Sequence, residues 1–449
     1  MNIGVIGVGY VGLVQGVILS DFGMNIECMD SCSEKIEMLN NNVLPIFEPG
    51  LLELLKKNVA ENRLRFTTDM KETIQNNDVI LITVGTPSKA DGSVDLKYVL
   101  EVAKSVAEYI NGYKVIVNKS TVPVGTGQLV RQVIQKTLDK RGVQHDFDIV
   151  SNPEFLREGK AVNDCLRPNR VVIGTCSDRA KNIMKNVYSV LYLNKTPFLF
   201  TNIETAEMIK YASNAFLAVK ISFINEIALL AEKTGAVIQD IALAMGMDKR
   251  ISPKFLHAGP GFGGSCFPKD TRAIVDTALQ HGEELMVIEA AMRANEKQKK
   301  KMVWKIRYTM RESGNLSGVR IGVLGLTFKP DTDDMREAPS IDIIRGLVEA
   351  GATMRAYCPK GIEGARSMLM DLGDAITYAR DEYDLASGMD AIVLITEWNQ
   401  FRGLDLNRIK QVMRNNYFFD LRNVFAQRKD IVEGFKYFGV GSIPYFRNS

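Results

Sequence analysis

The first thirty residues constrain the fold most, because they place an apolar strand, a glycine-rich turn and a helix in a set order. Asn2–Ile6 predicts a short strand, Leu13–Phe22 a helix, and Asn25–Met29 a second strand. The turn, Gly7–Gly12, has the pattern G-x-G-x-x-G, and Asp30 follows the second strand. This order predicts a βαβ unit at the start of a parallel sheet.

Each part of this unit has a physical reason to be part of a dinucleotide site. Gly7 permits the tight turn, Gly9 lets the backbone approach a pyrophosphate, and Gly12 lets the helix pack closely on the strand. The free N–H groups of the helix N-terminus face the phosphates. Asp30 would accept hydrogen bonds from an adenosine ribose and repel a 2′-phosphate. The glycines alone could be structural, but the whole unit predicts an NAD site.

Composition excludes several other classes of protein. The chain has 449 residues, of which 46% are hydrophobic and 24% charged, as in a globular protein of several domains. Its 56 Lys and Arg against 53 Asp and Glu give no electrostatic reason to expect a nucleic acid or a membrane as partner. The 6 cysteines are scattered and the 3 histidines isolated, so neither a disulfide scaffold nor a metal centre is expected. We predict a reduced, cytoplasmic protein without metal.

Strands and helices continue to alternate after the first unit. The following runs predict further strands and helices: Val79–Val84, Val115–Asn118 and Asp148–Ser151 as strands, and Leu96–Tyr109 and Gly127–Arg141 as helices. Such alternation favours a doubly wound α/β fold, with helices on both faces of a parallel sheet.

The pattern then changes to long helices and returns to α/β. Residues 204–233 and 284–310 each predict one long helix, and a second α/β domain is expected from about Gly318, with strands at Arg320–Leu324, Thr353–Tyr357 and Ala391–Ile395. We therefore expect domains at 1–200, 201–312 and 313–449. The second long helix carries a cluster of lysines, which we interpret as a solvated helix face rather than a phosphate-binding patch: Lys297, Lys299, Lys300 and Lys301.

Two more strand ends carry small polar residues. Thr86 follows one predicted strand, and Ser120 and Thr121 follow another. Because open α/β sheets bind ligands at the carboxyl ends of their strands, these side chains could contact the cofactor. They could equally be ordinary loop and cap residues, and the sequence leaves both interpretations open.

The stretch Gly261–Asp270 is the best candidate for chemistry. Its glycines lead to Cys266, and a helix is expected from about Pro268. A helix N-terminus favours a thiolate, which is the nucleophilic form, and Asp270 in the first turn could act as a base toward water. The alternative is a buried structural cysteine.

Other polar groups are open to two interpretations. Lys210 and Asn214 lie four residues apart on one helical face and could hold an oxyanion, although a solvated lysine beside a surface asparagine is the commoner case. Glu154 and Glu158, in the loop Asn152–Gly159, could be acid–base groups or polar residues that open a helix. The sequence does not decide between these.

Taken together, the motifs resemble the UDP-glucose/GDP-mannose dehydrogenase family, and within it the branch that oxidises UDP-glucose. The resemblance spans nearly the whole chain and depends on six segments in order: Gly7–Gly12, Phe47–Leu51, Ser120–Pro123, Asn152–Gly159, Gly261–Asp270 and Phe328–Arg336. It implies two Rossmann-like, doubly wound parallel-sheet domains joined by a long central helix, through which the protein forms a homodimer. It also implies NAD as cofactor and UDP-glucose as substrate.

The reaction implied by the resemblance is oxidation of the C6 alcohol to a carboxylate in two hydride transfers. Cys266 would capture the intermediate aldehyde as a thiohemiacetal, which is oxidised to a thioester and hydrolysed. Lys210 and Asn214 would stabilise oxyanions, Asp270 would help to activate water, and Glu154, with Thr121 near it, would be an acid–base group.

The resemblance also implies the binding residues. Those for NAD are Gly7, Gly9, Tyr10, Val11, Gly12, Asp30, Lys35, Thr86, Ser120, Thr121, Glu158 and Arg336. Those for the sugar nucleotide are Glu154, Phe155, Leu156, Lys210, Asn214, Arg250, Phe255, Phe262, Gly263, Lys329 and Arg422. Among them, Arg250 would enter the site of the partner subunit, and Arg422 would meet the diphosphate.

Three alternatives remain at this point. The substrate could be GDP-mannose or a UDP-N-acetylhexosamine, although enzymes for acetamido sugars typically have His where Ser265 precedes the cysteine. A non-catalytic NAD sensor would need only the glycine turn and Asp30. A β-hydroxyacid dehydrogenase would use a lysine without a nucleophilic cysteine and would lack the last domain.

Overall fold

The computed structural model describes residues 1–89, 91–428 and 434–442, and its contacts divide the chain into two compact units. The first unit consists of Met1–Ser213 with Arg272–Glu283, and the second of Asn214–Thr271 with Glu284–Ser449. The chain thus passes between the units within two helices, Ile203–Thr234 and Phe267–Gln280, and once more in the loop between residues 280 and 286. The three domains expected from the sequence, 1–200, 201–312 and 313–449, remain a prediction.

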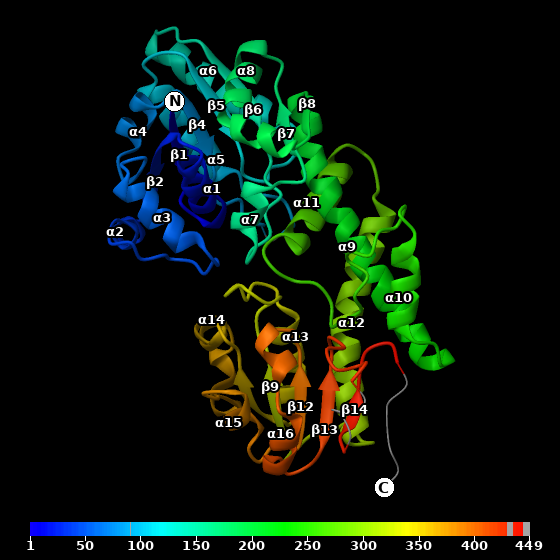
Figure 1. Ribbon diagram of the computed structural model, residues 1–449. Coiled ribbons are helices and arrows are strands. Elements are labelled where there is room, and N and C mark those ends of the chain that lie inside the picture. Colours follow the sequence, from blue (N-terminus) through cyan, green and yellow to red (C-terminus); the bar gives the residue numbers. More distant parts are fainter. Residues whose placement is uncertain (90, 429–433, 443–449) are drawn as a thin grey trace. The chain divides into compact units, whose positions relative to one another are not determined.

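In the first unit the described residues form an eight-stranded sheet in the order β3-β2-β1-β4-β5-β6-β7-β8 (Figure 1). Neighbouring strands are parallel, and the junction of β6 with β7 is antiparallel. The strands are β1 (Asn2–Ile6), β2 (Asn25–Met29), β3 (Leu64–Thr67), β4 (Val79–Ile82), β5 (Lys114–Asn118), β6 (Phe147–Ser151), β7 (Val171–Gly174) and β8 (Phe198–Thr201). The strand order reverses beside β1, where open sheets of this kind bind ligands.

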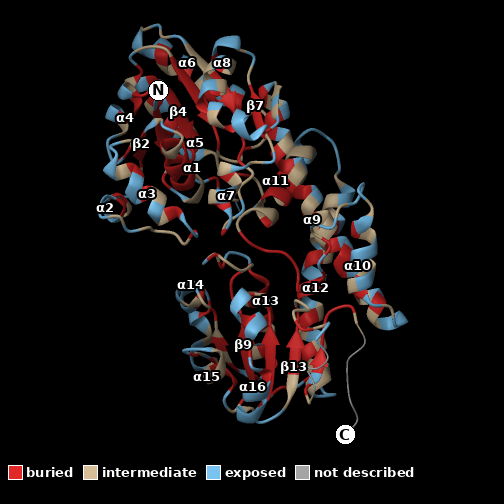
Figure 2. Ribbon diagram, viewed as in Figure 1, coloured by how far each residue is buried: buried red, intermediate tan, exposed pale blue. Residues whose placement is uncertain are grey.

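Helices cover both faces of this sheet. They are α1 (Tyr10–Asp21), α2 (Ser33–Asn40), α3 (Leu51–Ala60), α4 (Met70–Asn76), α5 (Lys97–Tyr109), α6 (Thr126–Arg141), α7 (Ala161–Leu166) and α8 (Asp178–Val187), followed by the 3₁₀ turn η1 (Ser189–Asn194). Strands β4 and β5 in the middle of the sheet are buried throughout (Figure 2). Val79 and Leu81 belong to one core cluster, while Ile80 and Ile82 belong to another. Successive side chains of a strand point to opposite faces, so the two clusters are the two sides of a doubly wound sheet.

The described part of the second unit contains a six-stranded parallel sheet in the order β11-β10-β9-β12-β13-β14. Its strands are β9 (Arg320–Leu324), β10 (Thr353–Tyr357), β11 (Ile376–Tyr378), β12 (Ala391–Leu394), β13 (Tyr417–Asp420) and β14 (Lys436–Phe438). Its other elements are α10 (Ile238–Met247), α12 (Met286–Met310), α13 (Pro339–Glu349), α14 (Ile362–Met368), η2 (Met370–Ala375), α15 (Glu382–Ala386), η3 (Asn399–Gly403) and α16 (Leu406–Val412). The prediction of two doubly wound α/β sheets is confirmed.

Two helices contribute residues to both units. These are α9 (Ile203–Thr234) and α11 (Phe267–Gln280). Among the described residues, α9 is the one helix long and apolar enough by length and composition to cross a membrane. It nevertheless buries Glu207 and Lys210, as the core helix of a globular unit can.

Two expectations about helices need correction. Helix α1 starts at Tyr10 instead of Leu13, because Gly9 already serves as its N-cap and the last glycine of the motif lies inside its first turn. In the lysine cluster of α12, Lys299 is not on the solvated face: it is buried and forms ion pairs of 2.8 Å with Glu296 and 3.0 Å with Asp342.

Candidate active site

The glycine turn after β1 has room for a dinucleotide. A Cβ on Gly12 would lie 2.0 Å from the carbonyl oxygen of Gly7, so helix and strand approach too closely for any side chain there. Gly7 has φ +98°, a conformation that favours glycine. A Cβ on Gly9, by contrast, would meet nothing within 4 Å. The turn therefore leaves open space at the N-terminus of α1, as a bound pyrophosphate requires.

Asp30 is held rigidly at the end of β2. Its Oδ2 accepts hydrogen bonds from the backbone N–H of Val8 at 2.8 Å and from Lys35 Nζ at 2.9 Å. Its Oδ1 accepts from the N–H of Cys32 at 3.1 Å. The Asp30 carboxylate thus links the glycine turn to α2, the helix that carries Lys35. The structure therefore brings Asp30 and Lys35, both predicted to bind the cofactor, together.

The polar residues at the next two strand ends bind one another. The hydroxyl of Thr86 donates to the carbonyl oxygen of Thr121 at 3.0 Å, and that of Ser120 donates to the carbonyl oxygen of Val84 at 2.7 Å. These bonds tie the loop after β4 to the loop after β5. They give both hydroxyls a structural role, beside the role in cofactor binding that the sequence predicts.

The loop after β6 contains a buried ion pair. Lys210 Nζ on α9 lies 2.9 Å from Glu154 Oε1, and each side chain is less than a tenth exposed. Burial alone would raise the pKa of Glu154, but the Lys210 ammonium and the hydrogen bond from the N–H of Leu156 lower it below its ordinary value. Glu154 is therefore ionised at neutral pH and able to accept a proton. The interpretation of Lys210 as a solvated lysine beside a surface asparagine is therefore wrong, because both Lys210 and Asn214 are buried.

Three residues that sequence reasoning did not single out surround this pair. Lys119 Nζ donates to Asn152 Oδ1 at 3.1 Å, which also accepts from the hydroxyl of Tyr188 at 2.6 Å. All three side chains are buried. The positive charge of Lys119 also contributes to the lowered pKa of Glu154. The sequence signal that could have identified Lys119 is its place directly after the apolar residues Val115–Val117 and Asn118 of a predicted strand.

Glu207, one turn before Lys210 on α9, was also missed. Its carboxylate accepts hydrogen bonds from the N–H groups of Gly125 at 2.7 Å and Gly127 at 2.8 Å, at the N-terminus of α6. Burial raises its pKa to about 7. This contact fixes the loop with Ser120 against the helix with Lys210.

In the second unit, Cys266 directly precedes α11, and Asp270 lies in the first turn of that helix. Asp270 is buried; its Oδ2 accepts a 2.6 Å hydrogen bond from Asn214 Nδ2, and its Oδ1 lies 2.8 Å from Lys269 Nζ. Cys266 is partly exposed, with its Sγ 3.5 Å from Ser265 Oγ. Cys266 is therefore not a buried structural cysteine, and a carboxylate with two partners, Asp270, lies four residues after it.

The glycine-rich segment before the cysteine is clamped on both sides. Phe262 exchanges hydrogen bonds with the side-chain amide of Asn295 on α12, at 2.8 and 3.0 Å. A Cβ on Gly263 would lie 2.1 Å from the carbonyl oxygen of Glu337. On the other side, Phe255 and Phe262 pack around Phe267 with ring centroids 6.0 Å apart.

The predicted residues from the end of the chain approach the same segment. Gly264 N–H donates to the carbonyl oxygen of Arg336 at 2.8 Å, and the Arg336 side chain pairs with Asp334. Arg422 Nη2 donates to the carbonyl oxygen of Phe328, next to Lys329, at 3.3 Å. Of the residues predicted to hold the substrate, the second unit thus contains Asn214, Phe255, Phe262, Gly263, Lys329 and Arg422, while Glu154, Phe155, Leu156 and Lys210 lie in the first unit. Arg250 also belongs to the second unit, where it is exposed and paired with Asp248.

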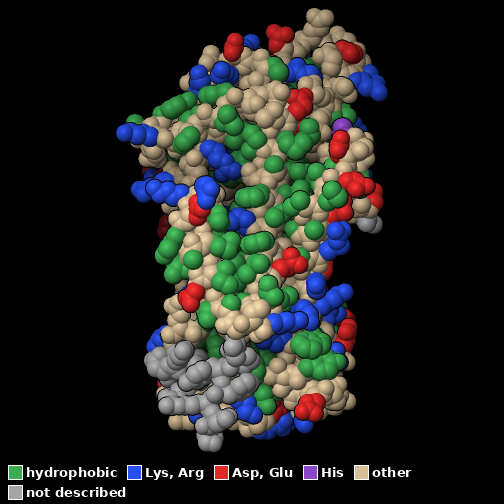
Figure 3. All heavy atoms as spheres, turned by 90° about the vertical axis from the view of Figure 1, so that its right-hand side faces the viewer, with side chains coloured by type: hydrophobic (Ala, Val, Ile, Leu, Met, Phe, Trp, Pro, Cys, Tyr) green, Lys and Arg blue, Asp and Glu red, His purple; other side chains and the backbone are tan. Residues whose placement is uncertain are grey.

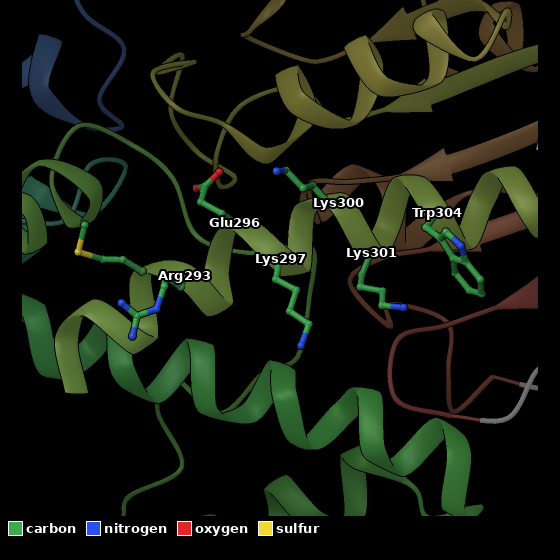
Figure 4. Close-up of a pocket in the computed structure, with 7 residues that line it drawn as sticks. Arg293, Glu296, Lys297, Lys300, Lys301 and Trp304 are labelled. Carbon is green, nitrogen blue, oxygen red and sulfur yellow. The ribbon is translucent and has the colours of Figure 1, made fainter. Parts of the chain in front are cut away.

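A groove on the second unit lies apart from these residues. It has a volume of about 700 Å³ and is lined by side chains of α12, among them Lys297, Lys301 and Trp304 (Figure 4). It contains none of the predicted site residues, and its lysines extend from the helix as expected for a solvated face. In the described part of the chain, no group of three or more His, Cys, Asp or Glu side chains could hold a metal ion.

Comparison with protein families gives three consecutive matches. Residues 1–192 match the NAD-binding domain of the UDP-glucose/GDP-mannose dehydrogenase family, residues 204–297 its central domain, and residues 322–427 its UDP-binding domain. Together the matches account for most of the chain.

Individual relatives agree with these matches. The chain is 48% identical to the UDP-glucose 6-dehydrogenase of Rhizobium meliloti (strain 1021), over 98% of this chain and 99% of the relative. The solved structure of a UDP-glucose dehydrogenase from the archaeon Pyrobaculum islandicum is similar with a TM-score of 0.89 and 37% identity, over 98% of both chains. A UDP-D-ManNAc dehydrogenase from Pyrococcus horikoshii is similar with a TM-score of 0.84 and 27% identity, over 98% of this chain and 99% of the other.

Proposed function

Because the chain belongs to the UDP-glucose/GDP-mannose dehydrogenase family and is an NAD-dependent oxidoreductase, we propose that it oxidises UDP-glucose at C6 to UDP-glucuronate. The observation that carries this proposal is the place of Cys266. It is a partly exposed thiol directly before α11, with Asp270 held in the first turn of that helix. The identity to UDP-glucose 6-dehydrogenases favours glucose over mannose or an acetamido sugar.

The cofactor residues are those of the first sheet. The turn from Gly7 to Gly12 holds the pyrophosphate, and Asp30 with Lys35 holds the adenosine ribose. When bound, NAD accepts a hydride in each of the two oxidations. Asp30 also repels a 2′-phosphate, which makes NAD the preferred cofactor over NADP.

In the first oxidation, the C6 hydroxyl loses its proton and C6 loses a hydride, which leaves an aldehyde. Glu154, ionised and buried, accepts the proton directly or through a water molecule. Lys210 donates to the oxygen as negative charge develops on it.

In the second oxidation, Cys266 Sγ forms a bond to the aldehyde carbon and its proton passes to the carbonyl oxygen, giving a thiohemiacetal. Loss of a hydride from that carbon and of the hydroxyl proton gives a thioester. Water then attacks the thioester carbon, the C–S bond breaks, and the thiol is restored. Asp270, held by Asn214, takes the proton of the attacking water.

We further propose that the protein is a cytoplasmic homodimer that pairs through α9. Phe216, Phe223 and Leu230 recur every seven residues on this helix and are exposed, and Leu243 and Met247 on α10 are exposed as well. Figure 3 shows hydrophobic side chains gathered on the face that contains these helices. Exposed apolar surface of this kind is typical of a subunit interface. Arg250, which is exposed, would then reach the site of the partner subunit.

The experiment that tests the function counts NADH per sugar nucleotide consumed by the purified protein. Two NADH per UDP-glucose, with UDP-glucuronate as product, are expected. Turnover of GDP-mannose or UDP-N-acetylmannosamine in place of UDP-glucose would show that the proposed substrate is wrong, while the proposed mechanism would still hold. Binding of NAD without turnover of any sugar nucleotide would contradict the proposal that the protein is an enzyme and would favour the alternative of a non-catalytic NAD sensor.

A further inference from the structure

The segment Phe47–Leu51 is part of the resemblance, yet the chemistry proposed above uses none of its residues. Within it, Glu48 is a carboxylate that is only 3% exposed. It precedes α3, a helix of the first unit that packs against α1, as α7 also does. A buried carboxylate needs hydrogen-bond donors around it, so its partners indicate what it is for.

Glu48 has partners from two distant parts of the chain. Its Oε2 accepts hydrogen bonds from the hydroxyl of Tyr10 and, at 2.7 Å, from the N–H of Gly159. Its Oε1 accepts from the N–H of Ala161 at 2.8 Å. The Gly159 N–H also donates to the Tyr10 hydroxyl oxygen at 2.9 Å, so the three groups form a closed triangle.

The two parts joined in this way are the two binding segments of the first unit. Tyr10 begins α1 and belongs to the cofactor turn. Gly159 ends the loop that starts at Asn152 and carries Glu154. On its outer side the same loop is held by Arg157, whose guanidinium pairs with Asp164 at 2.5 Å. Glu48 is the contact that holds its inner side to the cofactor turn.

We propose that Glu48 is a positioning residue for this reaction, which holds the cofactor turn and the substrate loop at a set distance through Tyr10 and Gly159. The inference rests on the function proposed above. A hydride passes only between atoms in close contact, so a small shift of the loop against the turn changes the rate strongly, by about 10²-fold for a displacement of 1 Å.

A carboxylate suits this task because all its lone pairs accept and it donates nothing. Its hydrogen-bond partners include three backbone N–H groups, those of Gly159, Ala161 and Val162, and the phenol of Tyr10, and all four donate to it. A glutamine at this position would have the same shape, but its NH₂ group would face one of those donors and the triangle would open.

The test compares Glu48→Gln with Glu53→Gln, a matched change of an exposed carboxylate on neighbouring α3. We expect E48Q to lower kcat/KM for UDP-glucose by about 10²-fold and to raise KM for NAD as well, while E53Q stays within about twofold of the wild type. Tyr10→Phe alone should raise KM for UDP-glucose, although Tyr10 lies in the cofactor turn. Added to E48Q, it should change that KM no further, because the link is already broken.

Amide hydrogen exchange of the peptide 155–163 gives a readout independent of turnover. Faster exchange in E48Q and Y10F than in E53Q is expected. If the wild-type protein is inactive on UDP-glucose but this exchange pattern appears, the proposed function is wrong, while the contact through which Glu48 joins the cofactor turn to the substrate loop is supported. Wild-type kinetics and exchange in E48Q, or an effect of Y10F that adds in full to that of E48Q, would overturn the link. Should E48Q not fold, Y10F decides: an unchanged KM for UDP-glucose would reject the proposal.

Discussion

The turn after the first strand of each sheet, β1 and β9, begins with a glycine in the same conformation, but the residues that follow this glycine differ between the two turns. Gly7 after β1 and Gly325 after β9 both have positive φ, +98° and +85°. The N–H of Gly7 donates to the carbonyl oxygen of Met29 at the end of β2, and that of Gly325 donates to Tyr357 at the end of β10. A Cβ on either glycine would collide with the chain that follows the neighbouring central strand.

Beyond this glycine the two turns have different residues. Where the first turn has Gly9, the second has Thr327, whose hydroxyl donates to the carbonyl oxygen of Lys329 at 2.9 Å and accepts from Trp398 Nε1 at 3.2 Å. Where β2 is followed by Asp30, β10 is followed by Cys358, which is buried. The first glycine thus serves the topology of any such sheet, while the later glycines and the acidic residue serve the dinucleotide. This explains why the first turn is open and the second is filled by its own side chains.

The largest expected effect comes from a change that should abolish the chemistry of the second unit, which contains the thiol, and leave NAD binding by the first unit intact. We expect Cys266→Ser to lower the formation of UDP-glucuronate by about 10³-fold or more, because a hydroxyl is a far weaker nucleophile than a thiolate. The affinity for NAD should stay within about twofold, since the glycine turn is untouched. Stopped-flow NADH formation and calorimetric NAD titration measure the two. A variant that still forms the uronate at the normal rate would rule out the covalent step.

The next effect tests whether the two turns differ in function. Gly12→Ala places a Cβ 2.0 Å from the carbonyl oxygen of Gly7, so α1 must move and the affinity for NAD should fall by about 100-fold. Thr327→Ala in the second turn is the matched change and should leave NAD binding unaltered. Isothermal titration calorimetry checks both. Equal losses in the two variants would show that the second turn also takes part in NAD binding.

A smaller change is expected from the acidic residue. Asp30→Ser removes the acceptor for the ribose and the charge that repels a 2′-phosphate. We expect kcat/KM with NAD to fall about 30-fold and that with NADP to rise, as two lost hydrogen bonds of about 1 kcal/mol each suggest. Cys358→Ser, at the corresponding place in the second sheet, serves as control. If the ratio of kcat/KM with NAD to kcat/KM with NADP did not change, Asp30 would not be a residue of the ribose site.

The last prediction concerns stability and two of the buried carboxylates, Glu207 on α9 and Asp420 on β13. Burial raises the pKa of Glu207 to about 7, and burial also raises the pKa of Asp420 at the end of β13. The folded protein then keeps a proton on Glu207 that the unfolded chain has released. Between pH 4.5 and about 7 the free energy of unfolding therefore falls as pH rises, by no more than about 3 kcal/mol.

Glu207→Gln should remove this part of the pH dependence, and Glu226→Gln, which changes an exposed carboxylate on the same helix, should not. Urea unfolding between pH 4.5 and 8 measures the difference. The same slope in the E207Q variant and the wild type would assign the pH dependence to other groups.

Much of the fold could be predicted because its signals are local. The strands β1, β2, β9 and β10 match the sequence prediction to the residue, since short apolar runs bounded by glycine and polar residues have few alternatives. The start of α1 was placed three residues late, because the glycine motif itself forms the first turn. The burial of Lys299 was also missed, since its partner Asp342 lies in another helix.

The sequence alone determined the residue types: a glycine turn with an acidic residue after the next strand, a cysteine before a helix, and two long helices. Only the tertiary structure decided which of them have partners. Lys210 meets Glu154 and Asn214 meets Asp270, each across 56 residues of chain, and Glu48 meets Gly159 across 111. Hydrophobic periodicity depends on nearest neighbours along the chain, whereas burial of a charge depends on which distant groups the folded sheet brings to it.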